Sequence, residues 1–223
     1  GNLAIHDSLH LLSELNSDEG LPLFGDAQIS PNNFTMEHKI DFLGEPRQTS
    51  LDGFISGDYQ ISIECKFTEP EVGTCSRPRL LPNASNYENE LCNGNYSIQR
   101  SRKKRCSLTE IGVAYWQYIS SLFNWENDID MNPCPLNKNY QLVRNILAVG
   151  VKPDKSVTLN HGHAILIYDE RNPSCQPSGN IYTAYLETRN ALLEPKMLRK
   201  ISWQKIVKQM RNKESLPWLT EQL

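Results

Sequence analysis

The sequence lacks any long hydrophobic run. A helix that spans a bilayer needs about 20 consecutive apolar residues, and no stretch of the 223 residues approaches that length. The amino terminus also lacks a basic stretch followed by an apolar core, which is the pattern of a secretory leader. We therefore expect a soluble protein with no membrane partner.

A strong excess of one charge is also missing. The formal net charge is −3, which is too small to indicate a nucleic-acid partner by itself. The basic residues are unevenly placed, however, because five of the six residues in "RSRKKR" are basic. This cluster predicts either a nucleic-acid-binding patch or a solvated loop. Its members are Arg100, Arg102, Lys103, Lys104 and Arg105.

The six cysteines include no C-x₂-C pair, so the usual spacing of a structural zinc site is absent. Three N-x-S/T sequons, at Asn33, Asn83 and Asn95, keep an extracellular, disulfide-rich glycoprotein as an alternative. A chain of this length depends on disulfides less than a small secreted domain does. We therefore expect a cytoplasmic protein.

Several runs have the periodicity of regular structure. Strands of a meander are expected at residues 34–45, 49–57 and 58–69, and a further strand at 163–173. Helices are expected at residues 2–16, 108–123, 137–150 and 202–212, the second of them with a capping box formed by Ser107 and Glu110. The run "YTAYLETR" fits a strand or a helix start. This order indicates one α/β domain over residues 1–223.

Residues 70–106 form an irregular, cysteine-containing insertion with little periodicity. Four cysteines bracket this insertion and the helix after it: Cys75, Cys92, Cys106 and Cys134. Their thiolates could hold a structural Zn²⁺ or an iron-sulfur cluster, which would supply folding energy to an aperiodic segment. Free thiols or disulfides are the alternative.

The run "ISIECKFTE" places two opposite charges inside an apolar strand pattern. Strand side chains alternate between faces, so Ile61, Ile63, Cys65 and Phe67 share a core face. Glu64 and Lys66 then lie side by side on the opposite face, about 6.5 to 7 Å apart along the strand. An ordinary exposed ion pair is one interpretation. A site in which both groups touch one ion or one water is the other.

Asp52 bears on this choice. A role in capping a turn is the ordinary interpretation of an acid at this position. With "ECK" Asp52 forms a D-x₁₁-E-x-K pattern across two neighbouring antiparallel strands. Two carboxylates and a strand carbonyl are hard oxygen ligands suited to Mg²⁺, and a lysine beside them can position a water for attack on a phosphate.

"TSLD" and "IECKFTE" resemble the core motif of the PD-(D/E)XK superfamily, the restriction-endonuclease-like nucleases. The resemblance covers residues 35–70 by motif and 135–170 by element order, although Leu51 stands where the family name has proline. It implies a mixed central sheet flanked by helices. It also implies Asp52, Glu64 and the backbone carbonyl of Cys65 as ligands of Mg²⁺ or Mn²⁺, and Lys66 as the residue that positions the nucleophilic water.

The resemblance also implies further residues. Many members carry an additional upstream acid, for which Glu45 is better placed than Glu37, and some carry a glutamine on a following helix. Gln141, Arg144 and Asn145 share one polar helix face, which is either solvated or directed at phosphate. We expect a catalytic role for Gln141 and a phosphate contact for Arg144.

The sequence therefore predicts a metal-dependent DNA endonuclease. A non-catalytic nucleic-acid-binding protein on the same fold is the alternative, beside the extracellular protein. RNA as substrate and the oligomeric state, including a dimer, stay open. The H-x-H pair at His161 and His163 can ligate metal, but no third ligand is near in sequence, and a core or surface role at the edge of a strand is favoured.

Overall fold

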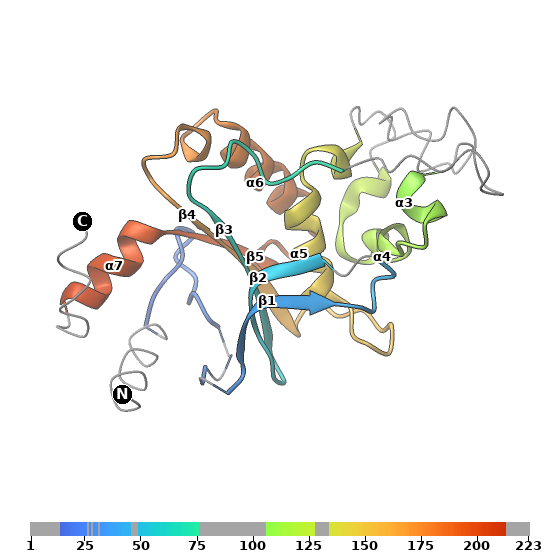
Figure 1. The fold of residues 1–223 in the computed structure, drawn as a ribbon, viewed down its shortest axis with the longest axis horizontal. Coiled ribbons are helices and arrows are strands. Elements are labelled where there is room, and N and C mark those ends of the chain that lie inside the picture. The colour runs from blue at the N-terminus through green and yellow to red at the C-terminus, as the bar shows by residue number, and fades with distance from the viewer. Residues whose placement is uncertain are drawn as a thin grey trace.

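A mixed five-stranded sheet lies at the centre of the protein (Figure 1), with the strand order β1-β2-β3-β4-β5. The structure, a computed structural model, describes residues 14–25, 27, 29–30, 32–45, 49–75, 106–127 and 134–212. The strands are β1 (Phe34–Ile40), β2 (Thr49–Ile55), β3 (Gln60–Lys66), β4 (Gly162–Tyr168) and β5 (Leu198–Ser202).

Helices cover the sheet. The α-helices of the described residues are α3 (Ser107–Glu110), α4 (Tyr115–Leu122), α5 (Tyr140–Gly150), α6 (Asn180–Ala191) and α7 (Trp203–Asn212). Short 3₁₀ turns are η1 (Asn124–Asn127), η2 (Pro135–Asn137), η3 (Pro173–Cys175) and η4 (Pro195–Met197). Figure 1 shows α5 and α6 on one side of the sheet and α7 at one end of it.

The strand directions follow from the connections. β1, β2 and β3 pair antiparallel, and the four-residue link 56–59 between β2 and β3 is short enough for a hairpin. β3 and β4 pair parallel, which requires a crossover connection, and α5 supplies it by packing on both strands. β4 and β5 are also parallel, with α6 between them in sequence. The predicted α/β class, a mixed sheet flanked by helices with the order of a restriction-endonuclease-like core, is confirmed.

The sheet separates two hydrophobic clusters. The larger cluster includes Leu142 and Ile146 of α5, Leu166 of β4 and Tyr185 of α6. The smaller cluster lies on the other face and joins four groups: Ile61 and Ile63 of β3, Ile165 of β4, Ile206 of α7, and Leu15, Leu23 and Phe24 from the amino-terminal segment. Both faces of β3 are therefore covered, which makes any charge on this strand a buried charge.

The single helix predicted over residues 108–123 is wrong. α3 ends at Glu110, and α4 begins at Tyr115. Gly112 between them has a φ of +96°, and the backbone of Gly44 approaches it so closely that a Cβ on Gly44 would lie 2.2 Å from the Gly112 carbonyl oxygen. This backbone contact ends the first helical turn. Ser107 is accordingly the first residue of a one-turn helix and not the cap of a long one.

Two further elements differ from a single clear prediction: one segment has two alternative assignments, and one strand is not predicted from the sequence. "YTAYLETR" is part of helix α6, and β5 was not predicted at all. Only the end of the helix expected at residues 2–16 lies in the described part, where Asn16 pairs with Pro22 in an isolated β-bridge instead. Residues 76–105 of the predicted insertion lie outside the described residues.

His163 has the core role, which is one of the two expected for this pair. Its ring is fully buried, with Nε2 2.7 Å from the Leu23 carbonyl oxygen and Nδ1 3.0 Å from the Tyr59 hydroxyl. A neutral ring that donates from Nε2 and accepts at Nδ1 satisfies both partners. Burial, and then the charge of Arg199, lower the pKa of His163 from 6.5 to about 3.

This lowered pKa predicts acid sensitivity. The unfolded chain binds a proton at His163 near pH 6.5 and the folded chain only near pH 3, so the neutral ring contributes full stability above pH 6.5 and loses it as the pH falls toward 3. Between pH 7.5 and 4.5 the wild type should lose about 2.5 kcal/mol more than His163→Gln. Urea unfolding of both proteins at the two pH values measures the difference, and equal losses would contradict the assignment.

Candidate metal and nuclease site

Asp52 lies beside the "ECK" segment, as predicted. The antiparallel register pairs Gly53 with Ile63, which brings the next residue of β2, Asp52, level with Glu64 of β3. The Asp52 carboxylate reaches across to β3, where Oδ2 accepts a hydrogen bond of 2.7 Å from the backbone N–H of Cys65. The Asp52 carboxylate is therefore fixed to the backbone of Cys65, the residue that lies between Glu64 and Lys66 in the sequence.

Glu64 and Lys66 form a buried ion pair. Lys66 Nζ lies 2.9 Å from Glu64 Oε1, and the two residues are 5% and 1% exposed. The interpretation as an ordinary pair on a solvated strand is wrong. Burying two charges costs free energy that their attraction does not always repay, so a pair kept in this position calls for additional partners.

The strand alternation holds up to the end of β3. Ser62 and Glu64 contact α5, while Ile61 and Ile63 belong to the cluster on the other face and Cys65 packs against it. Phe67 departs from the expected core position: β3 ends at Lys66, and Phe67 is 41% exposed with its ring edge toward Trp203.

Helix α5 supplies the further partners of Glu64. Asn145 Nδ2 donates to Glu64 Oε2 at 2.9 Å, and Arg144 Nη2 lies 3.5 Å from the same oxygen. Both α5 residues are buried, so the solvated-face interpretation of this part of the helix is wrong. Helical spacing predicts the shared polar face but not the contact between Asn145 and Glu64, because spacing alone does not specify which face of a helix meets the sheet.

A family model described as Restriction Endonuclease associating with ARP matches residues 12–223. The chain belongs to this family. No curated protein and no solved structure matches the chain. Membership places the chain among restriction-endonuclease-like nucleases, whose substrate is nucleic acid. Within the described residues, no helix is long and apolar enough to cross a membrane.

Several buried polar atoms around Glu64 have no hydrogen-bond partner in the structure. They include Glu64 Oε1, Asn145 Oδ1 and Arg144 Nε. Glu64 Oε1 has the Lys66 ammonium nearby but no well-directed hydrogen bond. Because buried polar atoms are nearly always satisfied, a carboxylate oxygen in this state is suited to a cation. Asp52 and Glu64 therefore fit a divalent metal ion.

The Cys65 side chain is not a candidate ligand or nucleophile. Burial, and then the charges of Asp52 and Glu64, raise the pKa of its thiol to about 12. The thiolate is the reactive and metal-binding form, so this thiol is inert near neutral pH. Only the backbone of Cys65 is left for a role in the site.

Gln141 lies at the first turn of α5, against the start of the insertion. A Cβ on Gly73 would lie 2.7 Å from Gln141 Oε1, and the backbone N–H groups of Tyr140 and Gln141 donate to the carbonyls of Gly73 and Val72 at 3.3 and 3.2 Å. The contacts of Glu64 come from Lys66, Arg144 and Asn145, and the structure does not bring Gln141 into this group.

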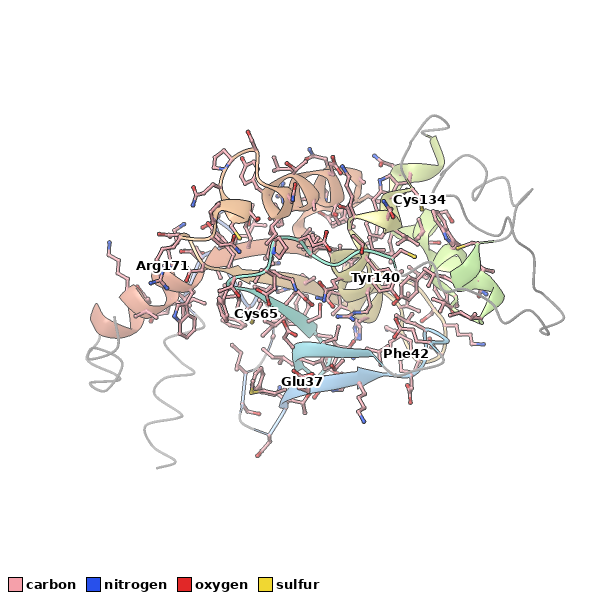
Figure 2. The ribbon with its side chains drawn as sticks, turned by 45° about the horizontal axis from the view of Figure 1, so that its top comes forward. Glu37, Phe42, Cys65, Cys134, Tyr140 and Arg171 are labelled. Atoms are coloured by element: carbon pink, nitrogen blue, oxygen red, sulfur yellow. The ribbon has the colours of Figure 1, made fainter. Side chains whose placement is uncertain are left out.

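The two upstream acids lie in different surroundings. Glu45 accepts a hydrogen bond from the Tyr115 hydroxyl, beside the Tyr140 ring, and this acid contributes to the raised pKa of Tyr115, of which burial is the main cause. Glu37 lies on the outer strand β1 (Figure 2), is exposed, and accepts from Ser50 Oγ at 2.6 Å. Its φ of +49° interrupts the regular strand.

The structure describes three of the four cysteines predicted to bind a metal and none of the predicted basic cluster. Cys92 and the basic cluster at residues 100–105 lie outside the described residues. Cys134 is part of the larger hydrophobic cluster, and Cys75 and Cys106 pack against it. Figure 2 shows Cys134 well away from Cys65. Among the described residues, no group of three His, Cys, Asp or Glu side chains is placed to hold a metal ion.

Proposed function

We propose that the protein is a Mg²⁺-dependent endonuclease of the PD-(D/E)XK type, which hydrolyses phosphodiester bonds of DNA. The observation that carries this proposal is the meeting of Asp52, from the middle of β2, with Glu64 and Lys66, at the end of β3, where Glu64 Oε1 is buried beside Lys66 and has no hydrogen bond. The family match supports a nuclease, and the fit of the two carboxylates supports the metal.

Each residue has a distinct part in the proposed reaction. Asp52, Glu64 and the Cys65 carbonyl would hold the ion, and the chemistry that it would supply is to offset negative charge on the scissile phosphate and to make water a better nucleophile. Lys66, 2.9 Å from Glu64, orients the attacking water through its ammonium group. Arg144 adds a second cation beside Glu64 for the phosphate.

The balance of charges in the site supports the roles proposed for these residues. The two acids, Asp52 and Glu64, face two cations, Lys66 and Arg144, so this group of four side chains is neutral before an ion enters. A divalent ion gives it a charge of +2, which complements a phosphodiester and the additional negative charge that develops during attack by water. The protein alone therefore attracts phosphate less than its metal complex does.

The direct experiment uses supercoiled plasmid. Incubation with the purified protein and Mg²⁺ or Mn²⁺ should yield nicked or linear DNA, and a chelator should stop the reaction. Retention of DNA in a gel-shift assay without cleavage in either metal would favour the non-catalytic alternative, in which the fold binds nucleic acid only. Cleavage of RNA but not of DNA in parallel reactions would correct the substrate.

We also propose that the protein is cytoplasmic and forms a single nuclease domain. The thiols of Cys65 and Cys175, which lie outside the proposed cysteine-metal set, form no disulfide in the structure, which supports a reducing environment. A count of reactive thiols in denaturant, with and without prior reduction, should give the same number. A clear increase after reduction would favour the extracellular, disulfide-rich alternative.

A structural metal on the four cysteines remains a prediction. Purified protein should contain zinc or iron at about one atom or cluster per chain, held by Cys75, Cys92, Cys106 and Cys134. Elemental analysis of protein that has never met a chelator measures it. Cys134→Ser should lower the metal content, whereas the matched control Cys175→Ser, outside the proposed set, should not. The absence of both metals from the wild type would contradict the prediction.

A further inference from the structure

Asn145 is a buried amide in contact with the proposed metal ligand. Its side chain is 0% exposed, and Nδ2 donates to Glu64 Oε2 at 2.9 Å. Its own Oδ1 has no hydrogen-bond partner in the structure. An amide with one unsatisfied buried atom stabilises a fold less than an apolar side chain of similar size would. Packing alone therefore does not account for asparagine at this position.

The backbone around Asn145 is fixed to the same strand. Ser62 Oγ, two residues before Glu64 on β3, donates to the Asn145 carbonyl oxygen at 2.9 Å. Leu142 and Ile146 of α5 are buried in the larger hydrophobic cluster on either side of this turn. The amide is thus held at a constant distance from Glu64, as a group that orients a metal ligand has to be.

The two oxygens of Glu64 differ as a result. Oε2 is engaged by Asn145 and lies 3.5 Å from Arg144 Nη2, whereas Oε1 faces the Lys66 ammonium and has no hydrogen bond. We propose that Asn145 is a positioning residue, which holds Oε2 so that Oε1 is presented to the divalent ion. This inference rests on the proposed function. It assigns Asn145 no contact with substrate or with the reacting atoms.

The test measures Mn²⁺ binding and Mn²⁺ activation in parallel. Free Mn²⁺ is counted by its electron paramagnetic resonance signal during titration, and plasmid cleavage is followed over a wide range of Mn²⁺ concentration. Asn145→Leu keeps the approximate volume and removes the donor, and Asn145→Ala removes it without adding bulk. Both should bind Mn²⁺ about 10- to 100-fold more weakly than the wild type.

Saturation with metal separates positioning from chemistry. At saturating Mn²⁺ the Asn145 variants should recover a maximal rate near that of the wild type, because the amide touches no reacting atom. Glu64→Gln should not recover at any Mn²⁺ concentration. Asn139→Ala is the matched control: Asn139 is also a fully buried asparagine, but neither polar atom of its amide has a hydrogen-bond partner in the structure and it is not among the contacts of Glu64, so its Mn²⁺ midpoint should stay within about twofold of the wild type.

The outcomes can be told apart. If both Asn145 variants melt at a lower temperature but keep the wild-type Mn²⁺ midpoint, Asn145 is a packing residue and the inference is wrong. If only one of the two Asn145 variants folds, the Mn²⁺ midpoint of that variant alone tests the inference. If the wild type neither binds Mn²⁺ nor cleaves, the proposed function itself fails. If the wild type binds Mn²⁺, Glu64→Gln loses it and the Asn145 variants keep it, only the inference fails.

Discussion

Glu64→Gln is expected to abolish plasmid cleavage and to weaken Mn²⁺ binding. The substitution keeps the shape of the side chain and a carbonyl oxygen for Asn145, but it removes the charge that a divalent ion requires of its ligand. Loss of several kcal/mol of electrostatic stabilisation corresponds to a rate decrease of about 10³-fold or more. Initial rates on supercoiled plasmid and a Mn²⁺ titration measure the two effects.

Folding has to be controlled in this experiment. Removing one member of a buried ion pair can cost about 3 to 5 kcal/mol, so rates are compared at a temperature at which circular dichroism shows the variant folded. Glu187→Gln is the matched control, because Glu187 forms an ion pair with Lys138 at the surface. It should cleave like the wild type. Equal rates in Glu64→Gln and Glu187→Gln would remove Glu64 from the proposed site.

Lys66→Ala is expected to abolish cleavage while Mn²⁺ binding is kept. The lysine is assigned to the attacking water and not to the ion, so its loss stops the reaction without removing a ligand. Its ammonium lies 2.9 Å from Glu64 Oε1, where it would compete with the proposed metal ion for that oxygen. Mn²⁺ should therefore bind Lys66→Ala as tightly as the wild type or more tightly, in the same titration.

Two controls accompany this variant. Lys196→Ala removes a largely exposed lysine that pairs with Glu194, and its activity should be unchanged. Cys65→Ala changes the residue between Glu64 and Lys66 but on the other face of β3; it should keep activity and lose about 1 kcal/mol of stability. If the Lys66→Ala protein cleaves at the wild-type rate, Lys66 has no part in the reaction and its ion pair with Glu64 is purely structural.

The arrangement at β3 could be predicted from the sequence because it depends on local rules. The period of two places Glu64 and Lys66 together and Cys65 opposite, and a short turn brings β2 antiparallel to β3. The approach of Asp52 to Cys65 follows from these two facts alone. Local periodicity thus predicted the part of the site that lies on one hairpin.

Features that depend on distant contacts could not be predicted in this way. The break between α3 and α4 requires the close approach of Gly44 to Gly112. The strand β5 carries Arg199 and Lys200 among five residues and reads as exposed, yet β4 and the larger cluster bury Leu198. The burial of Arg144 and Asn145 follows from the packing of α5 on β3, which helical periodicity does not specify.

The central claim, a divalent ion held by Asp52 and Glu64, is tested most directly by a crystal soaked with Mn²⁺. Anomalous scattering should show one ion at about 2.0 to 2.3 Å from Glu64 Oε1, from an Asp52 carboxylate oxygen and from the Cys65 carbonyl oxygen. The account predicts that Asn145 keeps its hydrogen bond to Glu64 Oε2 in that crystal. A crystal at saturating Mn²⁺ with no anomalous peak beside Glu64, and with the Glu64–Lys66 ion pair unchanged, would contradict it.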